Sequence, residues 1–217
     1  MKSKDTTGQR YARIAVLVSG GGTNLQALID AQSRGELQNG KITFVLASNS
    51  GAYALKRAEK AGIESAVVSR KEYDSKEAYD IAVLKELENR NIDLIVLAGF
   101  LSILGSELVE KYRNKIINIH PSLIPLFCGD GFYGLKVHEA VLASGMKVTG
   151  ATAHFVNEIT DGGAIILQKA VPIEQGDTPE ILQYRVMRLA EWEILPKAVS
   201  LFCMGKIKIE GNKTIIE

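Results

Sequence analysis

Short apolar runs alternate with longer amphipathic stretches along the first 120 residues. The apolar runs are rich in β-branched residues, as in strands that are buried on both faces of a parallel sheet. They cover residues 13–18, 42–47, 66–68, 93–98 and 116–119. The amphipathic stretches have helical spacing and cover residues 24–33, 52–61, 76–89 and 106–112. This alternation predicts an α/β fold with a doubly wound, mostly parallel sheet and a Rossmann-like N-terminal half.

The pattern changes after His120. Residues 121–134 are rich in proline, glycine and aromatic residues, which predicts a long ordered loop, and long loops in compact domains are usually functional. The remaining pattern predicts a helix at 137–144, strands at 147–156 and 165–173, a turn between them at 161–163, and a helix at 178–202.

Length and composition fit one domain of ordinary globular character. The chain has 217 residues, with 26 basic and 25 acidic side chains. We expect a single domain over residues 13–217, preceded by a flexible N-terminal tail at 1–12. The nearly neutral balance of charge predicts neither nucleic acid nor a membrane surface as a partner. Residues 1–10 lack the apolar segment of a secretory signal, and Cys128 and Cys203 lack metal-binding spacing, so we expect a cytoplasmic protein with reduced thiols.

The predicted topology indicates where a ligand would bind. In a doubly wound sheet, ligands bind beyond the carboxyl ends of the strands, where the direction of winding reverses. With the usual strand order, that crevice lies between the first and fourth strands. We therefore expect residues 19–24 and 99–104 to meet there, with Asn118 and His120 of the fifth strand beside them.

A glycine-rich loop at 19–24 connects the first strand to the first helix. Glycines at a helix start let backbone N–H groups approach an anion, which predicts a phosphate site. Thr23 and Gln26 also match a capping box, so a well-capped helix start is the alternative. No lysine follows the glycines as in a P-loop. Leu25 stands where a dinucleotide fingerprint needs glycine, and residues 48–50 lack its acidic residue, so we expect a single phosphate group rather than NAD.

Three polar residues are candidates for catalysis. Asn118 and His120 are two apart on a strand, so their side chains project from the same face at its carboxyl end. Asp161, in a Thr-Asp-Gly-Gly turn, would favour the protonated imidazole if it lay close to His120, and would thus raise the pKa of His120. Each residue also has a structural alternative: Asn118 could hold the following loop, His120 could be a core histidine, and Asp161 could simply form the turn.

A metal site built from His120, His138 and His154 is a weaker alternative. No pair of these residues has the spacing of metal ligands on a helix or a hairpin. We therefore expect no metal.

Four segments carry a specific combination of residues: Ser-Gly-Gly-Gly-Thr-Asn at 19–24, Ala-Gly-Phe at 98–100, Asn-Ile-His-Pro-Ser-Leu-Ile-Pro at 118–125, and His-Phe-Val at 154–156 followed by Asp-Gly-Gly. In this combination the chain resembles the phosphoribosylglycinamide formyltransferases, a group of the folate-dependent formyltransferases. The resemblance runs from about residue 13 to the last helix and implies a formyltransferase fold.

The resemblance also implies an activity and its site. The expected reaction is transfer of a formyl group from 10-formyltetrahydrofolate, as cosubstrate, to the amine of 5'-phosphoribosylglycinamide in de novo purine biosynthesis. The implied residues are Asn118, His120 and Asp161 for catalysis; Gly22, Thr23 and Asn24 at the substrate phosphate; Glu191 at the ribose; and Lys76, Leu101, Ser102, Ile103, Leu104 and Asn118 at the folate. The implied partners are small molecules, and the chain is expected to be a monomer or homodimer without a metal.

Two features depart from the family pattern, and other functions remain open. The loop at 126–134 is longer and more aromatic than in many members, and Ser102 and Lys76 stand where relatives carry arginine. A formyltetrahydrofolate hydrolase would transfer the formyl group to water, but that family has an additional N-terminal domain and lacks this glycine loop. Transfer to methionyl-tRNA would need a basic C-terminal module. A mononucleotide-binding module without catalysis, with His120 structural, is the third alternative.

Overall fold

The computed structural model describes residues 3–4 and 10–217. Its sheet has ten strands in the order β4-β3-β2-β5-β6-β7-β8-β10-β9, with β1 paired to β2. The strands are β1 (Ser3–Lys4), β2 (Arg10–Val18), β3 (Gly40–Ala47), β4 (Glu64–Val67), β5 (Leu94–Leu97), β6 (Ile116–His120), β7 (Val148–Phe155), β8 (Ile165–Pro172), β9 (Ile207–Glu210) and β10 (Lys213–Ile216). The helices are α1 (Thr23–Ser33), α2 (Ala54–Lys60), α3 (Lys76–Asn89), α4 (Ser106–Lys111), α5 (Leu135–Ala143), α6 (Pro179–Val186) and α7 (Trp192–Cys203), with a 3-10 turn η1 (Arg70–Glu72) and a π turn η2 (Met187–Glu191).

The N-terminal half of the sheet is parallel and doubly wound, as predicted. Strands β4, β3, β2, β5 and β6 run parallel to one another, so the first and fourth predicted strands are neighbours. From β6 onward the sheet is mainly antiparallel, with β7 pairing to both β6 and β8. The site is therefore expected at the carboxyl edge of β2, β5 and β6, where the winding reverses.

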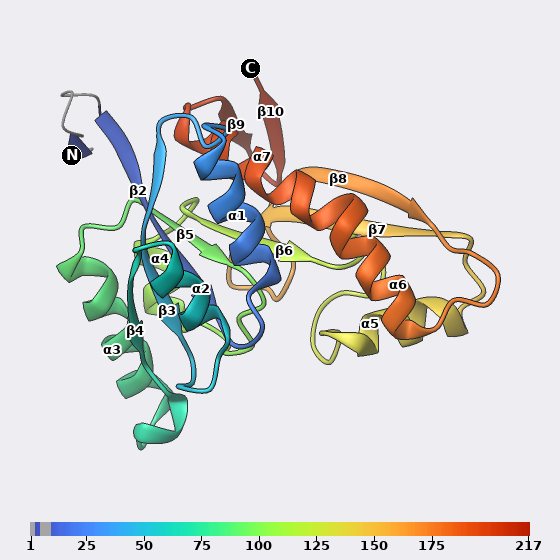
Figure 1. Ribbon diagram of the computed structural model, residues 1–217, viewed down its shortest axis with the longest axis horizontal. Coiled ribbons are helices and arrows are strands. Elements are labelled where there is room, and N and C mark those ends of the chain that lie inside the picture. Colours follow the sequence, from blue (N-terminus) through green and yellow to red (C-terminus); the bar gives the residue numbers. More distant parts are fainter. Residues whose placement is uncertain (1–2, 5–9) are drawn as a thin grey trace.

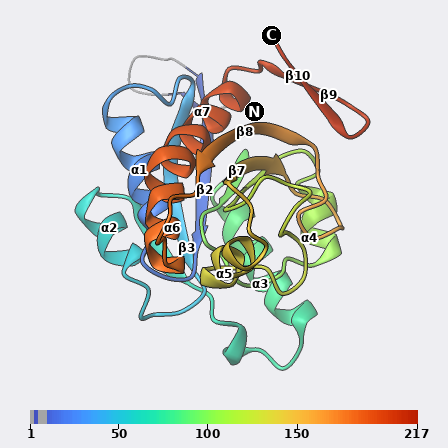
Figure 2. The same cartoon turned by 90° about the vertical axis from the view of Figure 1, so that its right-hand side faces the viewer.

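Helices cover both faces of the sheet (Figures 1 and 2). Alternate residues of a strand point to opposite faces. Accordingly Ile14, Val16 and Val18 of β2 lie in one apolar core, and Ala15 and Leu17 lie in the other. The first core is completed by α1, α6 and α7, and the second by α3 and α4. In Figure 1, α6 and α7 follow each other end to end, and α1 lies beside α7. This packing on two faces explains why the strands read as continuous apolar runs.

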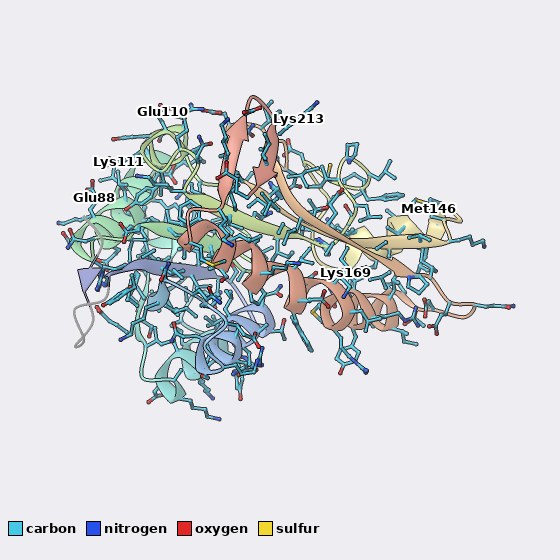
Figure 3. All side chains as sticks on the ribbon, turned by 90° about the horizontal axis from the view of Figure 1, so that it is seen from above. Glu88, Glu110, Lys111, Met146, Lys169 and Lys213 are labelled. Carbon is cyan, nitrogen blue, oxygen red and sulfur yellow. The ribbon has the colours of Figure 1, made fainter. Side chains whose placement is uncertain are left out.

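Ion pairs join neighbouring helices on the outer surface. Lys111 of α4 pairs with Glu88 of α3, and both side chains stand at the edge of the molecule in Figure 3. This ion pair connects the two helices. In the part of the chain that the structure describes, no helix is both long and apolar enough to cross a membrane.

Several elements differ from the predicted ones. The predicted helix at 178–202 consists of α6 and α7 joined by the π turn at 187–191. The capping box is wrong: Gly22 is the N-cap in the left-handed region, without a side-chain cap, and Thr23 already belongs to α1. The hairpin of β9 and β10 was not predicted; each of its strands is only four residues long.

The N-terminal tail needs one correction. Residues 10–12, which were assigned to it, belong to β2, and Ser3–Lys4 pairs antiparallel with the start of that strand. Residues 1–2 and 5–9 lie outside the described residues, so the flexibility of the tail stays a prediction.

Candidate active site

The segments that follow β2, β3 and β5 meet at the carboxyl edge of the sheet. The N–H of Ser19 donates to the carbonyl of Gly99 at 3.0 Å. The Ser19 hydroxyl oxygen accepts bonds from the N–H of Leu101 at 2.9 Å and from the Ser48 hydroxyl at 2.7 Å. The predicted meeting of residues 19–24 and 99–104 is therefore confirmed.

The glycine loop is held in one conformation by α2. The carbonyls of Gly20 and Gly21 accept bonds from Ala54 N–H at 3.1 Å and Arg57 Nε at 2.8 Å. Gly22 has a φ of +70°, and a Cβ there would lie 2.7 Å from the Cβ of Ala54, so only glycine fits. A Cβ at Gly20 or Gly21 would meet no atom within 4 Å, so this part of the loop is open to a ligand.

Glu191 lies beside the glycine loop. Its Oε2 accepts a bond from Asn24 Nδ2 at 2.6 Å, and Thr23 Oγ1 contacts Met187 Sδ of the same π turn at 3.6 Å. The carboxyl group is buried, and burial raises the pKa of Glu191 to about 7, with Asn24 partly opposing that effect. The π turn thus delivers a buried carboxyl group to the start of α1, and such turns frequently occur at functional sites.

Asn118, His120 and Asp161 come together as predicted. Asn118 Nδ2 lies 3.4 Å from Asp161 Oδ1, and His120 Nδ1 lies 3.5 Å from Asp161 Oδ2. Asn118 and His120 share one face of β6, and Asp161 reaches them from the turn between β7 and β8. One carboxylate therefore faces both the amide and the imidazole.

His120 is more enclosed than expected. Its side chain is 5% exposed, and Nε2 lies 2.8 Å from the backbone carbonyl of Phe127. The expected rise in the pKa of His120 is wrong: burial lowers it by more than Asp161 and the Phe127 carbonyl raise it. Burial alone would raise the pKa of Asp161, but His154, His120 and the N–H of Gly129 outweigh it and hold that pKa below its ordinary value.

The loop at 121–134 is ordered over these groups. The N–H of Gly129 donates to Asp161 Oδ2 at 2.9 Å, and Thr160 Oγ1 donates to Asp130 Oδ1 at 3.0 Å. Phe127 and Phe132 pack edge to face, with ring centroids 6.2 Å apart, and both contact the apolar core. The backbone of this loop therefore contacts two of the catalytic candidates, His120 and Asp161.

The candidate folate residues lie at the same edge but differ in exposure. Leu101 and Ile103 are 65% and 66% exposed, whereas Leu104 is buried in the core. Lys76 Nζ is paired with Asp80 at 2.9 Å. Exposed apolar side chains at the end of a buried strand suit a ring system, but the folate roles of these residues stay predictions.

A cavity of about 270 Å³ opens along the outer side of α1. It reaches the glycine loop at Thr23 and is also lined by Arg57 and Trp192. None of Asn118, His120 and Asp161 lines it, which agrees with the closed loop over them. Among the described residues, no group of three or more His, Cys, Asp or Glu side chains is placed to hold a metal ion.

His154 was not among the residues that were predicted to be catalytic. It lies opposite Asn118 in the pairing of β7 with β6, and its Nε2 is 3.1 Å from Asn118 Nδ2 and 3.5 Å from Asp161 Oδ1. The antiparallel pairing of β6 with β7 brings together the side chains of Asn118 and His154, which are 36 residues apart in the sequence. Periodicity within either strand cannot supply that register.

Comparison with known proteins agrees with this geometry. The family model described as formyl transferase matches residues 12–199. The chain belongs to the formyl transferase family. It is 39% identical over 205 residues to the phosphoribosylglycinamide formyltransferase of Haemophilus influenzae, covering 94% of this chain and 93% of that protein. The crystal structure of glycinamide ribonucleotide transformylase 1 from Symbiobacterium toebii superimposes with a TM-score of 0.89 at 39% identity, covering 95% of this chain and 94% of that one.

Larger proteins contain a similar segment. The chain is 45% identical over 206 residues to the trifunctional purine biosynthetic protein adenosine-3 of Bos taurus. The match covers 95% of this chain but only 20% of that protein, so this chain spans about a fifth of the length of that relative. The predicted resemblance and the formyltransferase fold are confirmed.

Proposed function

We propose that this protein transfers a formyl group from 10-formyltetrahydrofolate to the amino group of 5'-phosphoribosylglycinamide. The observation that carries the proposal is the convergence of Asn118, His120 and Asp161 at the same carboxyl edge of the sheet as a glycine loop suited to one phosphate group. Relatives that carry this name match nearly the whole chain, which favours transfer to an amine over transfer to water.

The chemistry assigns a role to each polar group. The neutral amine attacks the formyl carbon, a new C–N bond forms, and negative charge develops on the formyl oxygen. An amide N–H of Asn118 stabilises that oxygen, and loss of one such donor typically lowers the rate by about 100- to 1,000-fold. The bond to the folate nitrogen then breaks. That nitrogen takes a proton from His120, and the attacking amine gives one back to His120, so the imidazole ends in the protonation state in which it began. A placed acid typically contributes about 100- to 10,000-fold.

Asp161 and the loop at 121–134 control the protonation of His120. Burial is the main reason for the low pKa of His120 in the closed conformation. Movement of the Phe127 carbonyl away from Nε2 would hydrate the ring. The Asp161 carboxylate, 3.5 Å from Nδ1, would then favour the imidazolium form.

The remaining residues bind the two substrates. Gly22, Thr23 and Asn24 hold the phosphate at the start of α1, and Glu191 accepts bonds from the ribose hydroxyls. Lys76, the segment Leu101, Ser102, Ile103 and Leu104, and the Asn118 amide bind the folate. The proposal requires no metal, nucleic acid or membrane, and includes a cytoplasmic location and a monomer or homodimer.

A direct assay tests the proposal. Purified protein is mixed with 10-formyltetrahydrofolate and phosphoribosylglycinamide, and loss of the formyl folate is followed by absorbance. Turnover that requires both substrates supports the proposal, whereas equal loss without the ribonucleotide identifies a hydrolase. The variant His120→Ala should lose nearly all turnover and still bind the ribonucleotide. Binding without any turnover in the unaltered protein would favour a non-catalytic module.

A further inference from the structure

His154 is a buried partner of the candidate catalytic amide. It is 1% exposed, and it lies on β7 directly opposite Asn118 of β6. A side chain so enclosed within the sheet cannot exchange protons freely with solvent. Any part that it has in the reaction must therefore pass through the two side chains that it contacts, those of Asn118 and Asp161.

The contacts of the two ring nitrogens fix the tautomer of His154. Nδ1 lies 2.7 Å from the backbone carbonyl of Phe155, which can only accept, so Nδ1 carries the proton. Nε2 lies 3.1 Å from Asn118 Nδ2, which can only donate, so Nε2 is an acceptor. The ring is then neutral. A second proton, on Nε2, would be donated to Asp161 Oδ1 at 3.5 Å and would displace the bond from Asn118.

This acceptor decides which way the Asn118 amide faces. Two acceptors, His154 Nε2 and Asp161 Oδ1, lie on the same side as Nδ2, at 3.1 and 3.4 Å. The shorter contact occupies one hydrogen of the amide. The other hydrogen is donated to Asp161 Oδ1 at 3.4 Å, near the limit of a hydrogen bond, so an incoming formyl oxygen can compete for it without rotation of the amide. A half-turn of the amide would present Oδ1 instead and repel that oxygen.

We propose that His154 is a positioning residue, which holds the Asn118 amide with its N–H group toward the reacting carbonyl. The inference rests on the proposed function for its catalytic consequence, but the orientation of the amide is independent of it. His154 thus acts on the oxyanion contact without touching the substrate.

Two substitutions separate the roles of the ring nitrogens. His154→Asn keeps a donor near the Nδ1 position for the Phe155 carbonyl and removes the acceptor at Nε2. His154→Gln extends an amide to the Nε2 position, where its oxygen can accept from Asn118. We expect H154N to lower kcat by about 10- to 100-fold, part of the effect of losing an oxyanion donor, and to leave KM for phosphoribosylglycinamide unchanged. H154Q should recover most of kcat.

A double-mutant cycle with Asn118→Ala tests whether the effect passes through Asn118. In the N118A background, H154N should cause no further loss of kcat, because the amide that it orients is already gone. Equal losses in both backgrounds, or an unchanged kcat in H154N, would overturn the proposal. If H154N fails to fold, as judged by its thermal unfolding, H154Q alone is compared with the unaltered His154 in the two backgrounds. An equal loss of kcat in both backgrounds would then overturn the proposal.

A second measurement does not depend on activity. In ¹⁵N-edited NMR spectra, the side-chain Nδ2 protons of Asn118 should exchange with solvent faster in H154N than in the unaltered protein, with H154Q between them. Unchanged exchange in H154N contradicts the positioning role. Protection of these protons in a protein that transfers no formyl group would instead contradict only the proposed function.

Discussion

The backbone carbonyl of Phe127 lies 2.8 Å from Nε2 of His120 and occupies the hydrogen-bonding position that a substrate would need. The Gly129 N–H, two residues later, bonds to Asp161. Two peptide groups of one loop therefore form hydrogen bonds, one with the imidazole of His120 and the other with the carboxylate of Asp161. A substrate that bonds to His120 Nε2 or to Asp161 Oδ2 would have to displace this loop.

We predict that loosening the loop raises the pKa of His120. Gly129 has a φ of +86°, so Gly129→Ala strains the closed conformation, and the ring should become more hydrated. NMR titration of the free protein should place the pKa of His120 below 6.5, and G129A should move it upward. Gly145→Ala, at a φ of +73° after α5, carries similar strain away from the loop and serves as the control. The same shift in both variants would argue against the loop as the cause.

Glu191 is predicted to lower stability at alkaline pH. Folding raises its pKa from 4.5 to about 7, so its full contribution to stability is present below pH 4.5 and is lost as the pH rises through 7. That difference corresponds to roughly 3 kcal/mol. Glu191→Gln should raise the free energy of unfolding at pH 8 but not at pH 4, while raising KM for phosphoribosylglycinamide.

Glu193, two residues after Glu191, supplies the control for that measurement. Glu193 is exposed and paired with Lys169 on the surface, so Glu193→Gln should change neither the pH dependence of unfolding nor KM. A Glu191→Gln variant that unfolds like the unaltered protein at every pH is the result that would refute this assignment.

His138 is predicted to lower stability in acid. It is fully buried on α5, both ring nitrogens lack a partner among the described residues, and burial lowers its pKa to about 4, with His120 adding to the effect. The unfolded chain therefore takes up a proton first as the pH falls from 6.5 to 4, which costs the fold roughly 3 kcal/mol.

Chemical denaturation at pH 7 and pH 4 measures this effect. His138→Leu should remove that part of the acid loss, and it should not destabilise the protein at pH 7, because two unsatisfied polar atoms disappear. His138→Gln should also flatten the pH dependence, since it does not titrate, but it keeps a buried polar group. An undiminished acid loss in both variants would assign it to other residues.

The glycine loop offers a pair of substitutions that separate folding from binding. Gly22→Ala meets both a φ of +70° and the Cβ of Ala54, and should cost about 1–3 kcal/mol of unfolding free energy. Gly21→Ala meets nothing within 4 Å and should leave stability nearly unchanged. If the loop binds phosphate, G21A still weakens binding of the ribonucleotide in calorimetry, because its methyl group enters the anion position. Unaltered affinity in G21A would place the phosphate elsewhere.

The sequence predicted the parallel half of the fold well because its strands are buried on both faces. Helix α3 matches the predicted residues 76–89, and the neighbouring positions of β2 and β5 follow from ordinary winding. The π turn at 187–191 could not be predicted, since its residues continue a helical pattern and only packing, here against β7 and β8, distinguishes it.

The chemistry of the site was predicted less completely than its location. The shared position of Asn118 and His120 was predicted from the end of one strand, whereas the place of Asp161 beside them was implied by the resemblance to the family. The sign of the pKa shift of His120 was not predicted correctly, because it depends on how deeply a loop without regular structure buries the ring. His154 was overlooked for a similar reason: its partner is set by pairing between strands.

The pairing of Asn118 with His154, 36 residues later, and of Asn24 with Glu191, 167 residues later, also bears on synthesis of the chain. The ribosome releases the glycine loop and β6 well before the residues that complete them. A nascent chain that ends before the π turn at 187–191 thus contains the glycine loop, His120 and Asp161 but lacks the Glu191 carboxyl group that holds Asn24. Assembly of the whole pocket therefore waits until the π turn has been synthesised.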